Sequence, residues 1–509
     1  MAIKRLSKVL DLELAWRRVK KDQYDDFVPD ILELRDIDHD KAQVIDSIKE
    51  ALDRGYIPSD MLQVDAPKRG YTLRPCGYMT PEDRIVYQAV VDSISRRVKE
   101  PPQDCVFSHR LNEDLQSKSM FQFWRDWWLK WRKEMRATYS KGYCCLLRTD
   151  ITAYYEQIDH RTLRYRILNG EVKDKRILDL LDLLLRKWSL SGTRNIGIPQ
   201  GYDASSFLGN VYLIDLDKTM KRQNFKYYRY ADEIYVFTKD EREARRAIKE
   251  MTHVLRALHL NLQEAKTGIL TDPQKIAKEI GDDEEDKRRI FDYEFKRKVK
   301  TSDEEASEEE VKNKYKQITA YGKAQTVDTS DFKWCINKLR RLKNDTAVGF
   351  ILKRLAQMPF LADIFFEYLQ IFANRKKVKE GIINFLASED NIYEWQEMWL
   401  LLTLSKAKKL EDHQLDNVRA IVRDKFKSKI ARAAGILALA KLGDGEDRKW
   451  LADLFLGEDN DYIRRAIVVG IHGLPKPMRN TVYSGIENDC PAIKRLVNYL
   501  REKQEIQTI

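Results

Sequence analysis

The feature that most constrains this chain is a pair of aromatic-rich apolar runs that flank two acidic residues, Asp232 and Glu233. The runs are Tyr228-Arg229-Tyr230 and Ile234-Tyr235-Val236-Phe237. Runs of this kind around a short polar segment predict a β-hairpin with carboxylates at its tip. Adjacent carboxylates repel each other, and a bound cation removes that cost. A solvated turn is the alternative that this motif leaves open when it is taken alone.

A second acidic motif follows another apolar run. Residues 143–147 predict a strand, and Asp150 comes just after it, at the place where a carboxylate projects from a strand end. An Asp also caps helices, and the residues from Thr152 onward are typical of a helix start. Mg²⁺ prefers oxygen ligands and keeps phosphates in its shell, and two cations about 3.5–4 Å apart stabilise a phosphoryl displacement. Together the motifs predict a two-metal site that the fold assembles from Asp150 and Asp232, which are 82 positions apart.

A third motif lies between these two. The segment Gly197-Ile198-Pro199-Gln200-Gly201 predicts a loop that leads into a helix. The glycines let backbone approach a ligand closely, and the amide of Gln200 can both donate and accept hydrogen bonds.

The order of these motifs resembles the palm of reverse transcriptases. The matching stretches are Asp-Ile-x-x-x-Tyr at 150–155, Gly-Ile-Pro-Gln-Gly at 197–201 and Tyr-Ala-Asp-Glu at 230–233. Residues 258–267 are similar to the next motif of that family, and residues 68–75 and 82–88 look like its fingers strands and the helix after them. The resemblance covers about residues 66–270.

The resemblance implies a metal site. Asp150 and Asp232 would bind two catalytic Mg²⁺ (or Mn²⁺) ions, with the Ile151 carbonyl as a further ligand. Glu233 fills the second acidic place of the hairpin, where the family usually has Asp. Whether its longer side chain contacts metal is left open.

The resemblance also implies nucleotide-binding residues. Tyr155 takes the place of a steric gate that crowds a ribose 2′-OH, so dNTP substrates are expected. Lys68 and Arg74 would grip the triphosphate, a task suited to cations. Gln200 would contact the incoming nucleotide or its partner base, and Lys266 would lie near the leaving pyrophosphate as a candidate proton donor. Outside the motif order, Lys68 and Arg74 would be taken for two solvated residues among 92 basic ones.

The expected fold class is α+β: a reverse-transcriptase fingers/palm domain followed by an all-α, HEAT-like helical repeat domain. The repeat is suggested by weak self-similarity. Ile430-Ala431-Arg432-Ala433 resembles Ile463-Arg464-Arg465-Ala466, thirty-three positions on, and 386–391 resembles 456–460. An ordinary helical bundle is the alternative. The expected divisions are a helical N-terminal part of the fingers region (1–65), fingers and palm (66–275), a charged linker (276–317) and the repeat domain (318–509).

Four tryptophans, Trp124, Trp127, Trp128 and Trp131, recur at the spacing of one helical face. Basic residues surround them, so a base-stacking platform for a single strand is one interpretation. A face that packs against the palm or another subunit is the preferred one.

The pattern of a palm followed by helical repeats resembles the bacterial abortive-infection polymerases, the AbiK-like group, which includes a prophage-encoded member. That resemblance implies anti-phage defence, homo-oligomers, and DNA synthesis from dNTPs without a template. The single-stranded DNA would start from a Tyr hydroxyl and stay covalently attached to it. The sequence does not single out one of the 24 Tyr. A conventional RNA-templated reverse transcriptase of a retroelement and a catalytically silent scaffold are the alternatives.

Composition sets the remaining limits. The net charge of +11 permits a polyanionic partner without requiring one. No apolar run approaches the ~18–20 residues of a membrane span, so no membrane partner is expected. The six Cys form no CxxC pair, so neither a zinc ribbon nor a disulfide framework is indicated, and a cytoplasmic location is expected.

Overall fold

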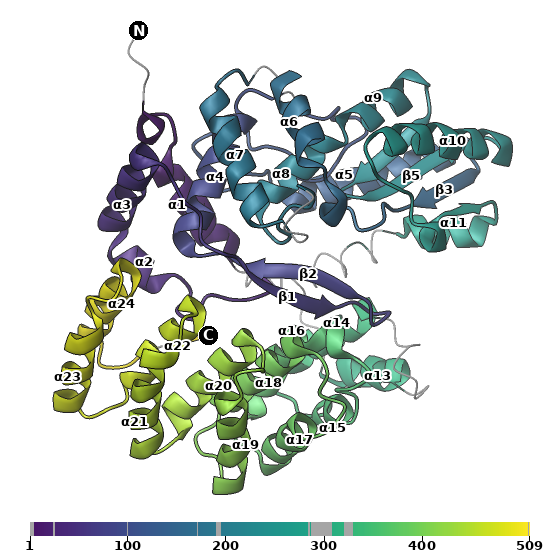
Figure 1. Ribbon diagram of the computed structural model, residues 1–509. Coiled ribbons are helices and arrows are strands. Elements are labelled where there is room, and N and C mark those ends of the chain that lie inside the picture. Colours follow the sequence, from purple (N-terminus) through teal and green to yellow (C-terminus); the bar gives the residue numbers. More distant parts are fainter. Residues whose placement is uncertain are drawn as a thin grey trace. The chain divides into compact units, whose positions relative to one another are not determined.

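The computed structural model describes residues 5–23, 26–98, 100–169, 172–189, 195–282, 286, 308–319, 329–506 and 508–509. It divides into two compact units, each made of separate stretches of the chain (Figure 1). The first unit comprises Met1–Asp26, Ala42–Leu62 and Met79–Ile290. The second comprises Phe27–Lys41, Gln63–Tyr78 and Phe291–Ile509. The divisions expected at 65, 275 and 317 stay predictions, and most of the expected linker lies outside the described residues.

The first unit contains a four-stranded antiparallel sheet. Its order is β4 (Lys226–Tyr230), β5 (Glu233–Thr238), β3 (Cys145–Thr149) and β6 (Gly268–Leu270). Tyr230 pairs with Glu233, so only Ala231 and Asp232 form the turn between β4 and β5. The predicted hairpin is therefore confirmed, with Asp232 at its tip and Glu233 as the first residue of the returning strand.

Helices form most of the rest of the first unit. They are α1 (Leu12–Asp22), α3 (Lys41–Arg54), α4 (Pro81–Ser95), α5 (Trp124–Ser140), α6 (His160–Asn169), α7 (Lys175–Lys187), α8 (Asp203–Tyr212), α9 (Ile214–Arg222), α10 (Glu241–Ala257) and α11 (Pro273–Ile280). The mixture of helices and antiparallel strands agrees with the expected α+β class.

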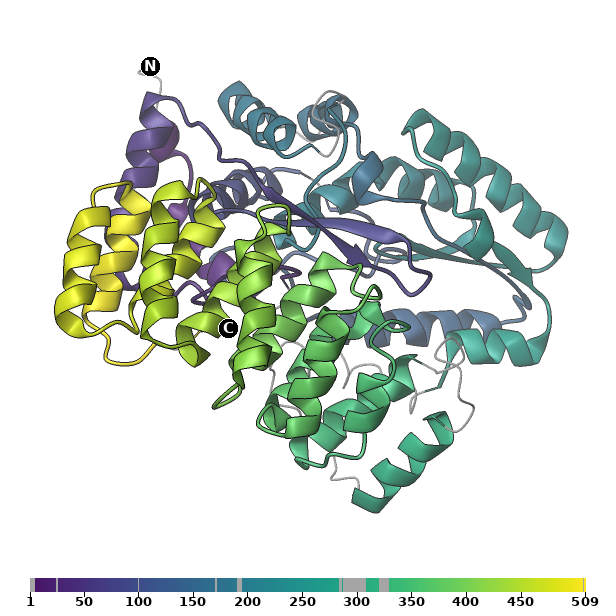
Figure 2. The ribbon, with the colours of Figure 1, turned by 60° about the horizontal axis from the view of Figure 1, so that its bottom comes forward.

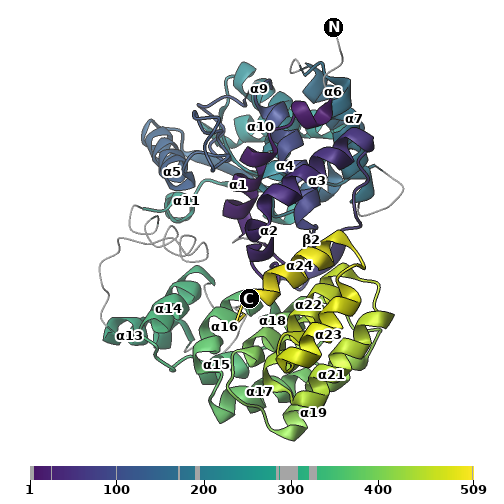
Figure 3. The same cartoon turned by 90° about the vertical axis from the view of Figure 1, so that its left-hand side faces the viewer.

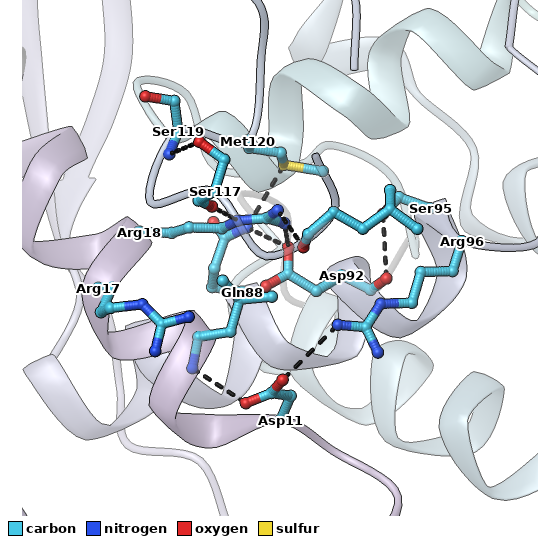
Figure 4. Close-up of polar contacts among 12 residues, drawn as sticks. Asp11, Arg17, Arg18, Gln88, Asp92, Ser95, Arg96, Ser117, Ser119 and Met120 are labelled. Carbon is cyan, nitrogen blue, oxygen red and sulfur yellow. Dashed lines mark hydrogen bonds and ion pairs between the residues drawn. The ribbon is translucent and has the colours of Figure 1, made fainter. Parts of the chain in front are cut away.

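Helix α4 is buried along almost its whole length and packs against α1, α7 and α8. Thr80 caps it by accepting a hydrogen bond from the Asp83 backbone N–H, and Pro81 occupies its first turn. Its buried carboxylate, Asp92, receives hydrogen bonds from Arg18 of α1 at 2.5 Å and from Gln88 at 2.7 Å (Figure 4). This pairing fixes α1 against α4, because an unpaired charge in that position would be costly.

The tryptophan face of α5 packs against the sheet. Trp131 is fully buried, its ring stacks on Tyr230 at 5.0 Å, and Trp128 meets the same ring edge-on at 5.3 Å. Trp127 is partly buried against the same core. The interpretation of this face as a packing surface is confirmed for Trp127, Trp128 and Trp131. These three rings therefore do not form a base-stacking platform.

The second unit contains a short hairpin and an array of helices. The hairpin is β1 (Leu62–Pro67) and β2 (Leu73–Tyr78), and a short helix, α2 (Arg35–His39), precedes it. The helices of the array are α13 (Glu308–Thr319), α14 (Thr329–Arg341), α15 (Val348–Leu352), α16 (Ala362–Leu369), α17 (Lys376–Leu386), α18 (Glu394–Ser405), α19 (Asp412–Arg423), α20 (Lys429–Leu442), α21 (Gly445–Leu454), α22 (Asp461–Ile471), α23 (Lys476–Ile486) and α24 (Pro491–Arg501).

All of these helices except α13, which packs on α14, form two rows (Figure 3). The inner row is α14, α16, α18, α20, α22 and α24, in which each helix packs on the next. The outer row, α15, α17, α19, α21 and α23, lies beside it, and α17 contacts both α15 and α19. The two similar segments that begin at Ile430 and Ile463 both start inner-row helices, α20 and α22.

A buried ionic cluster ties the early segments of the second unit to its last helices. Arg465 donates to Asp36 at 2.8 Å and to Asp30 at 3.1 Å, and the Tyr78 hydroxyl donates to Asp30 at 2.9 Å. The hairpin also lies along the array (Figure 2), where the Tyr71 hydroxyl donates to the Gln357 carbonyl at 3.2 Å. Among the described helices, none is both long and apolar enough to cross a membrane.

Candidate active site

Asp150 is the residue that follows β3, and its side chain is buried. One oxygen, Oδ2, forms an ion pair with Nζ of Lys266. The other, Oδ1, is buried and has no hydrogen-bond partner within the described residues. A buried carboxylate oxygen without a donor is a costly arrangement that a further cation would relieve.

Asp232 lies next to Asp150 because β3 and β5 are neighbours. Thr149 pairs with Ile234 across the two strands, so the ends that carry the two aspartates meet. Burial and the neighbouring Asp150 carboxylate raise the pKa of Asp232 to about 6. Both causes disfavour a second negative charge, and both would be offset by a divalent cation.

Arg229 holds the turn that contains Asp232 through hydrogen bonds. Nη1 of this buried guanidinium donates to the Ala231 carbonyl at 2.8 Å and to the Asn210 side-chain oxygen at 3.0 Å. Nε and Nη2 donate to the two oxygens of Asp217, at 2.8 and 2.7 Å. Burial alone lowers the pKa of Arg229, but Asp217 outweighs it and raises that pKa above its ordinary value.

Ala231 itself has a φ of 55°, in the left-handed region that favours glycine. Its N–H donates to the Ser108 hydroxyl at 2.7 Å. The backbone N–H and the carbonyl of Ala231 are thus both hydrogen-bonded, which compensates for an unfavourable backbone conformation. The roles of Arg229, Asp217 and Ser108 were not predicted from the sequence. The only signal was a charged residue, Arg229, inside an apolar strand.

Backbone hydrogen bonds hold the Lys266 segment against Asp150. The Gln263 N–H donates to the Asp150 carbonyl at 2.8 Å, and Thr152 N–H donates to the Asn261 carbonyl at 2.9 Å. Burial lowers the pKa of Lys266, but the hydrogen bond and charge of Asp150 more than reverse this and raise it. Lys266 is therefore a cation held next to the carboxylate pair.

Tyr154 and Tyr155 have different surroundings. Tyr154 is buried and its hydroxyl donates to the Gly209 carbonyl, which agrees with the core packing expected for it. Tyr155 is half-buried, and its hydroxyl is hydrogen-bonded to Ser206. A Cβ on Gly209 would lie 3.3 Å from the Tyr154 ring and 3.6 Å from the Tyr155 ring, so the glycine lets α8 approach both.

The loop at 197–201 is joined to the same segment. The Gly197 N–H donates to the Ile158 carbonyl and the Ile198 N–H to the Tyr155 carbonyl, both at 2.9 Å. Gly197 has a φ of 87° and Gly201 a φ of 95°, as the turn into α8 requires. Half-buried Gln200 lies between these glycines. Gln200 thus lies two positions after the residue that bonds to Tyr155, within the unit that holds the carboxylates.

The other predicted residues belong to the second unit or contribute less. Lys68 and Arg74 belong to the β1–β2 hairpin of the second unit, and the guanidinium of Arg74 lies 5.5 Å from the Phe27 ring. Glu233 is exposed, and its charge contributes to the raised pKa of Lys266. No group of three or more His, Cys, Asp or Glu is arranged to hold a metal within the ranges that the structure describes.

The residues present nevertheless fit a magnesium-type site. Such ions are commonly held by one or two carboxylates, with water and substrate phosphates completing the shell. Asp150 offers an oxygen without a donor, and Asp232 has a pKa raised by its neighbour. The Ile151 backbone follows directly, in an isolated bridge with Leu262.

Comparison with known proteins finds a family match that includes parts of both units. The family model described as reverse transcriptase (RNA-dependent DNA polymerase) matches residues 66–316. The group II intron-encoded protein LtrA of Lactococcus lactis subsp. cremoris is 27% identical over 244 residues, which are 47% of this chain and 37% of LtrA. A putative COX1/OXI3 intron 2 protein of Saccharomyces cerevisiae is 25% identical over 177 residues, 32% of this chain and 18% of that protein.

The match thus spans little more than a third of LtrA. Among solved structures, apo telomerase from Candida tropicalis aligns with 91% of this chain and 74% of its own, at 9% identity and a TM-score of 0.31. A likeness that low supports no conclusion about fold or function. The family match and the two intron-encoded relatives show instead that this chain contains a reverse transcriptase domain, over residues 66–316.

Proposed function

We propose that this chain is a DNA polymerase that adds deoxynucleotides by divalent-metal catalysis. The observation that carries this proposal is the adjacency of Asp150 and Asp232 at neighbouring strand ends, inside a domain that matches reverse transcriptases. Asp150, Asp232 and the Ile151 carbonyl would hold Mg²⁺ or Mn²⁺. When bound, the two ions supply Lewis-acid stabilisation of the attacking and leaving oxygens.

The reaction is an in-line displacement at the α-phosphate of a dNTP. A hydroxyl oxygen forms the new bond to phosphorus, the bond to pyrophosphate breaks, and the hydroxyl proton is released. Lys266 would stabilise the charge that develops on pyrophosphate, since its ammonium is held beside the site. Lys68 and Arg74 would bind the triphosphate, Tyr155 would exclude a 2′-OH, and Gln200 would contact the nucleotide.

The biological role that we propose is anti-phage abortive infection in the cytoplasm. The chain would synthesise single-stranded DNA without a template, primed by a Tyr hydroxyl, as a homo-oligomer. Two features support it: the resemblance of the motif order and an array of helices that pack in two rows. Neither feature identifies the Tyr that would prime.

The test is incubation of the purified chain with one labelled dNTP and Mg²⁺ or Mn²⁺, with no template. The expected result is label that stays with the protein on a denaturing gel and disappears after protease treatment. Peptide mass spectrometry then locates the modified Tyr. Asp150→Asn and Asp232→Asn should each abolish the label, and absence of an adduct with every dNTP would overturn protein priming.

The second candidate is an RNA-templated reverse transcriptase of a retroelement, which the intron-encoded relatives favour. It predicts that product appears only when an RNA template and primer are added, and that product sequence copies the RNA. A silent scaffold predicts that a variant carrying both Asp150→Asn and Asp232→Asn still protects cells from phage.

A further inference from the structure

Three consecutive turns of the helical array expose an excess of cations. The turns join α14 to α15, α16 to α17 and α18 to α19, all at the same edge of the two rows. They present six exposed cations, referred to below as the basic edge: Lys343, Arg375, Lys376, Lys377, Lys408 and Lys409.

Direct contacts show that these turns are neighbours. Arg375 of the second turn forms an ion pair with Asp345 of the first. The Lys408 backbone N–H of the third turn donates to the Asn374 side-chain oxygen of the second at 2.7 Å. The cations therefore form one patch and are not scattered along the array.

Three nearby acids, Asp345, Glu380 and Glu411, offset part of this charge, and Glu411 lies 3.6 Å from the ring of His413. Arg375 is paired with Asp345, and Lys376 lies 3.6 Å from Glu380 in an exposed i,i+4 pair, which contributes little. The other four make no ion pair within the described part of the chain: Lys343, Lys377, Lys408 and Lys409. Like charges held this close repel one another, and a polyanion relieves that repulsion.

The helix dipole does not explain the two lysines of the second turn. Lysines at the C-terminal end of a helix complement its dipole, and Lys408 and Lys409, which follow α18, have that ordinary explanation. Lys376 and Lys377 occupy the first turn of α17, which contains no acidic residue. Cations at that end oppose the dipole, so their placement fits an external anion better than a need of the helix itself.

We propose that the basic edge binds the phosphate backbone of single-stranded DNA. Adjacent packed helices lie about 8–10 Å apart, so cations on successive turns are spaced more widely than neighbouring phosphates. A flexible single strand can follow such a row and place phosphates at each turn, which a compact anion cannot. The choice of DNA rests on the proposed polymerase function, whose product is such a strand.

The test compares two charge-matched variants of the full chain. The first, Lys377→Gln/Lys408→Gln/Lys409→Gln, neutralises the edge. The control, Lys353→Gln/Lys425→Gln/Lys429→Gln, neutralises three exposed lysines from other turns of the array. Both also carry Asp150→Asn, so that binding is measured without synthesis. The probe is a fluorescently labelled oligo(dT), and its affinity is measured by anisotropy across a range of salt concentrations.

The edge variant should bind more weakly, and its slope of log affinity against log salt should fall by about 2, since each phosphate contact on a single strand contributes roughly 0.7. The control should keep the slope of the Asp150→Asn parent. An unchanged slope in the edge variant overturns the proposal. Equal competition by poly-glutamate also overturns it, in favour of an acidic protein partner. Because no turnover is measured, a negative result here is distinct from failure of the proposed activity.

Discussion

Arg229 and Asp217 form a bidentate, fully buried ion pair next to the turn that holds Asp232. The pair joins β4 to α9, and the remaining guanidinium nitrogen reaches the Ala231 carbonyl. Each partner supplies the counter-charge of the other, and the Tyr227 hydroxyl also donates to Asp217 at 2.9 Å. The loss of either one therefore leaves a buried charge uncompensated.

The first prediction concerns the stability of this pair. Asp217→Asn should lower the free energy of unfolding by about 3–5 kcal/mol, because the Arg229 charge stays buried while its counter-charge is removed. Denaturation in urea, followed by tryptophan fluorescence, measures this. Lys218→Gln is the matched control, since Lys218 is exposed one position further along α9. Equal stability of the two variants would contradict the assignment.

The second prediction concerns positioning of the turn. Arg229→Lys keeps the positive charge but cannot reproduce the planar fork that contacts Asp217 and the Ala231 carbonyl. Mn²⁺ affinity should fall by about 10–100-fold, as for other groups that orient metal ligands. Titration calorimetry with Mn²⁺ on the folded variant measures this independently of turnover. If Arg229 were only structural, Mn²⁺ affinity would be unchanged at temperatures where the variant is folded.

The third prediction concerns sugar selection. Tyr155→Val should increase the use of ribonucleotides relative to deoxynucleotides by roughly 10–100-fold, since removing a steric barrier in a pocket changes discrimination on that scale. Incorporation of single rNTPs and dNTPs, compared as kcat/KM, measures the ratio. Tyr154→Phe removes only a hydroxyl that is bonded to the Gly209 carbonyl, so it should leave the ratio unchanged. A similar ratio in both variants would reject Tyr155 as the gate.

The fourth prediction concerns acid stability of the second unit. Burial raises the pKa of Asp36, but the charges of Arg465 and Arg495 outweigh burial and hold it below its ordinary value of 3.8. The Asp36 carboxylate therefore stabilises the fold above pH 3.8, and this contribution is lost as the pH falls from 3.8 through the lower, folded-state pKa.

Asp36→Asn tests this directly. At pH 7 it should lower the free energy of unfolding by about 3–5 kcal/mol, because Arg465 loses its closest partner. The difference between wild type and variant should shrink as the pH falls below 3.8. Asp38→Asn, on the same short helix, provides the comparison. A difference that stays constant down to the lowest pH would show that titration of Asp36 is not involved.

The local features of the active site could be predicted from the sequence. Aromatic and β-branched runs on both sides of Asp232-Glu233 predicted the hairpin, whose turn the structure places one position earlier, at Ala231-Asp232. The apolar run before Asp150 predicted a strand, which the structure places at Cys145–Thr149. Both depend on short-range patterns that a single stretch of chain contains.

Long-range partners could not be predicted in the same way. Arg229 and Asp217 look like two ordinary charges when read in sequence, and only the fold buries them together. The segments Phe27–Lys41 and Gln63–Tyr78 join the second unit because Asp30, Asp36 and Tyr78 surround Arg465. Periodicity within a segment contains no information about a partner so far along the chain.

This interleaving has a consequence for synthesis of the protein on the ribosome. Asp30 and Arg465 are 435 positions apart. At roughly 5–20 residues per second, Asp30 leaves the ribosome about 20–90 seconds before its partner is made. The carboxylates of Asp30 and Asp36 must stay hydrated for that time, because neither can be buried without the arginine. The second unit can therefore reach its final packing only near the end of translation. A nascent chain truncated before Arg465 would lack the cation that pairs with Asp30 and Asp36.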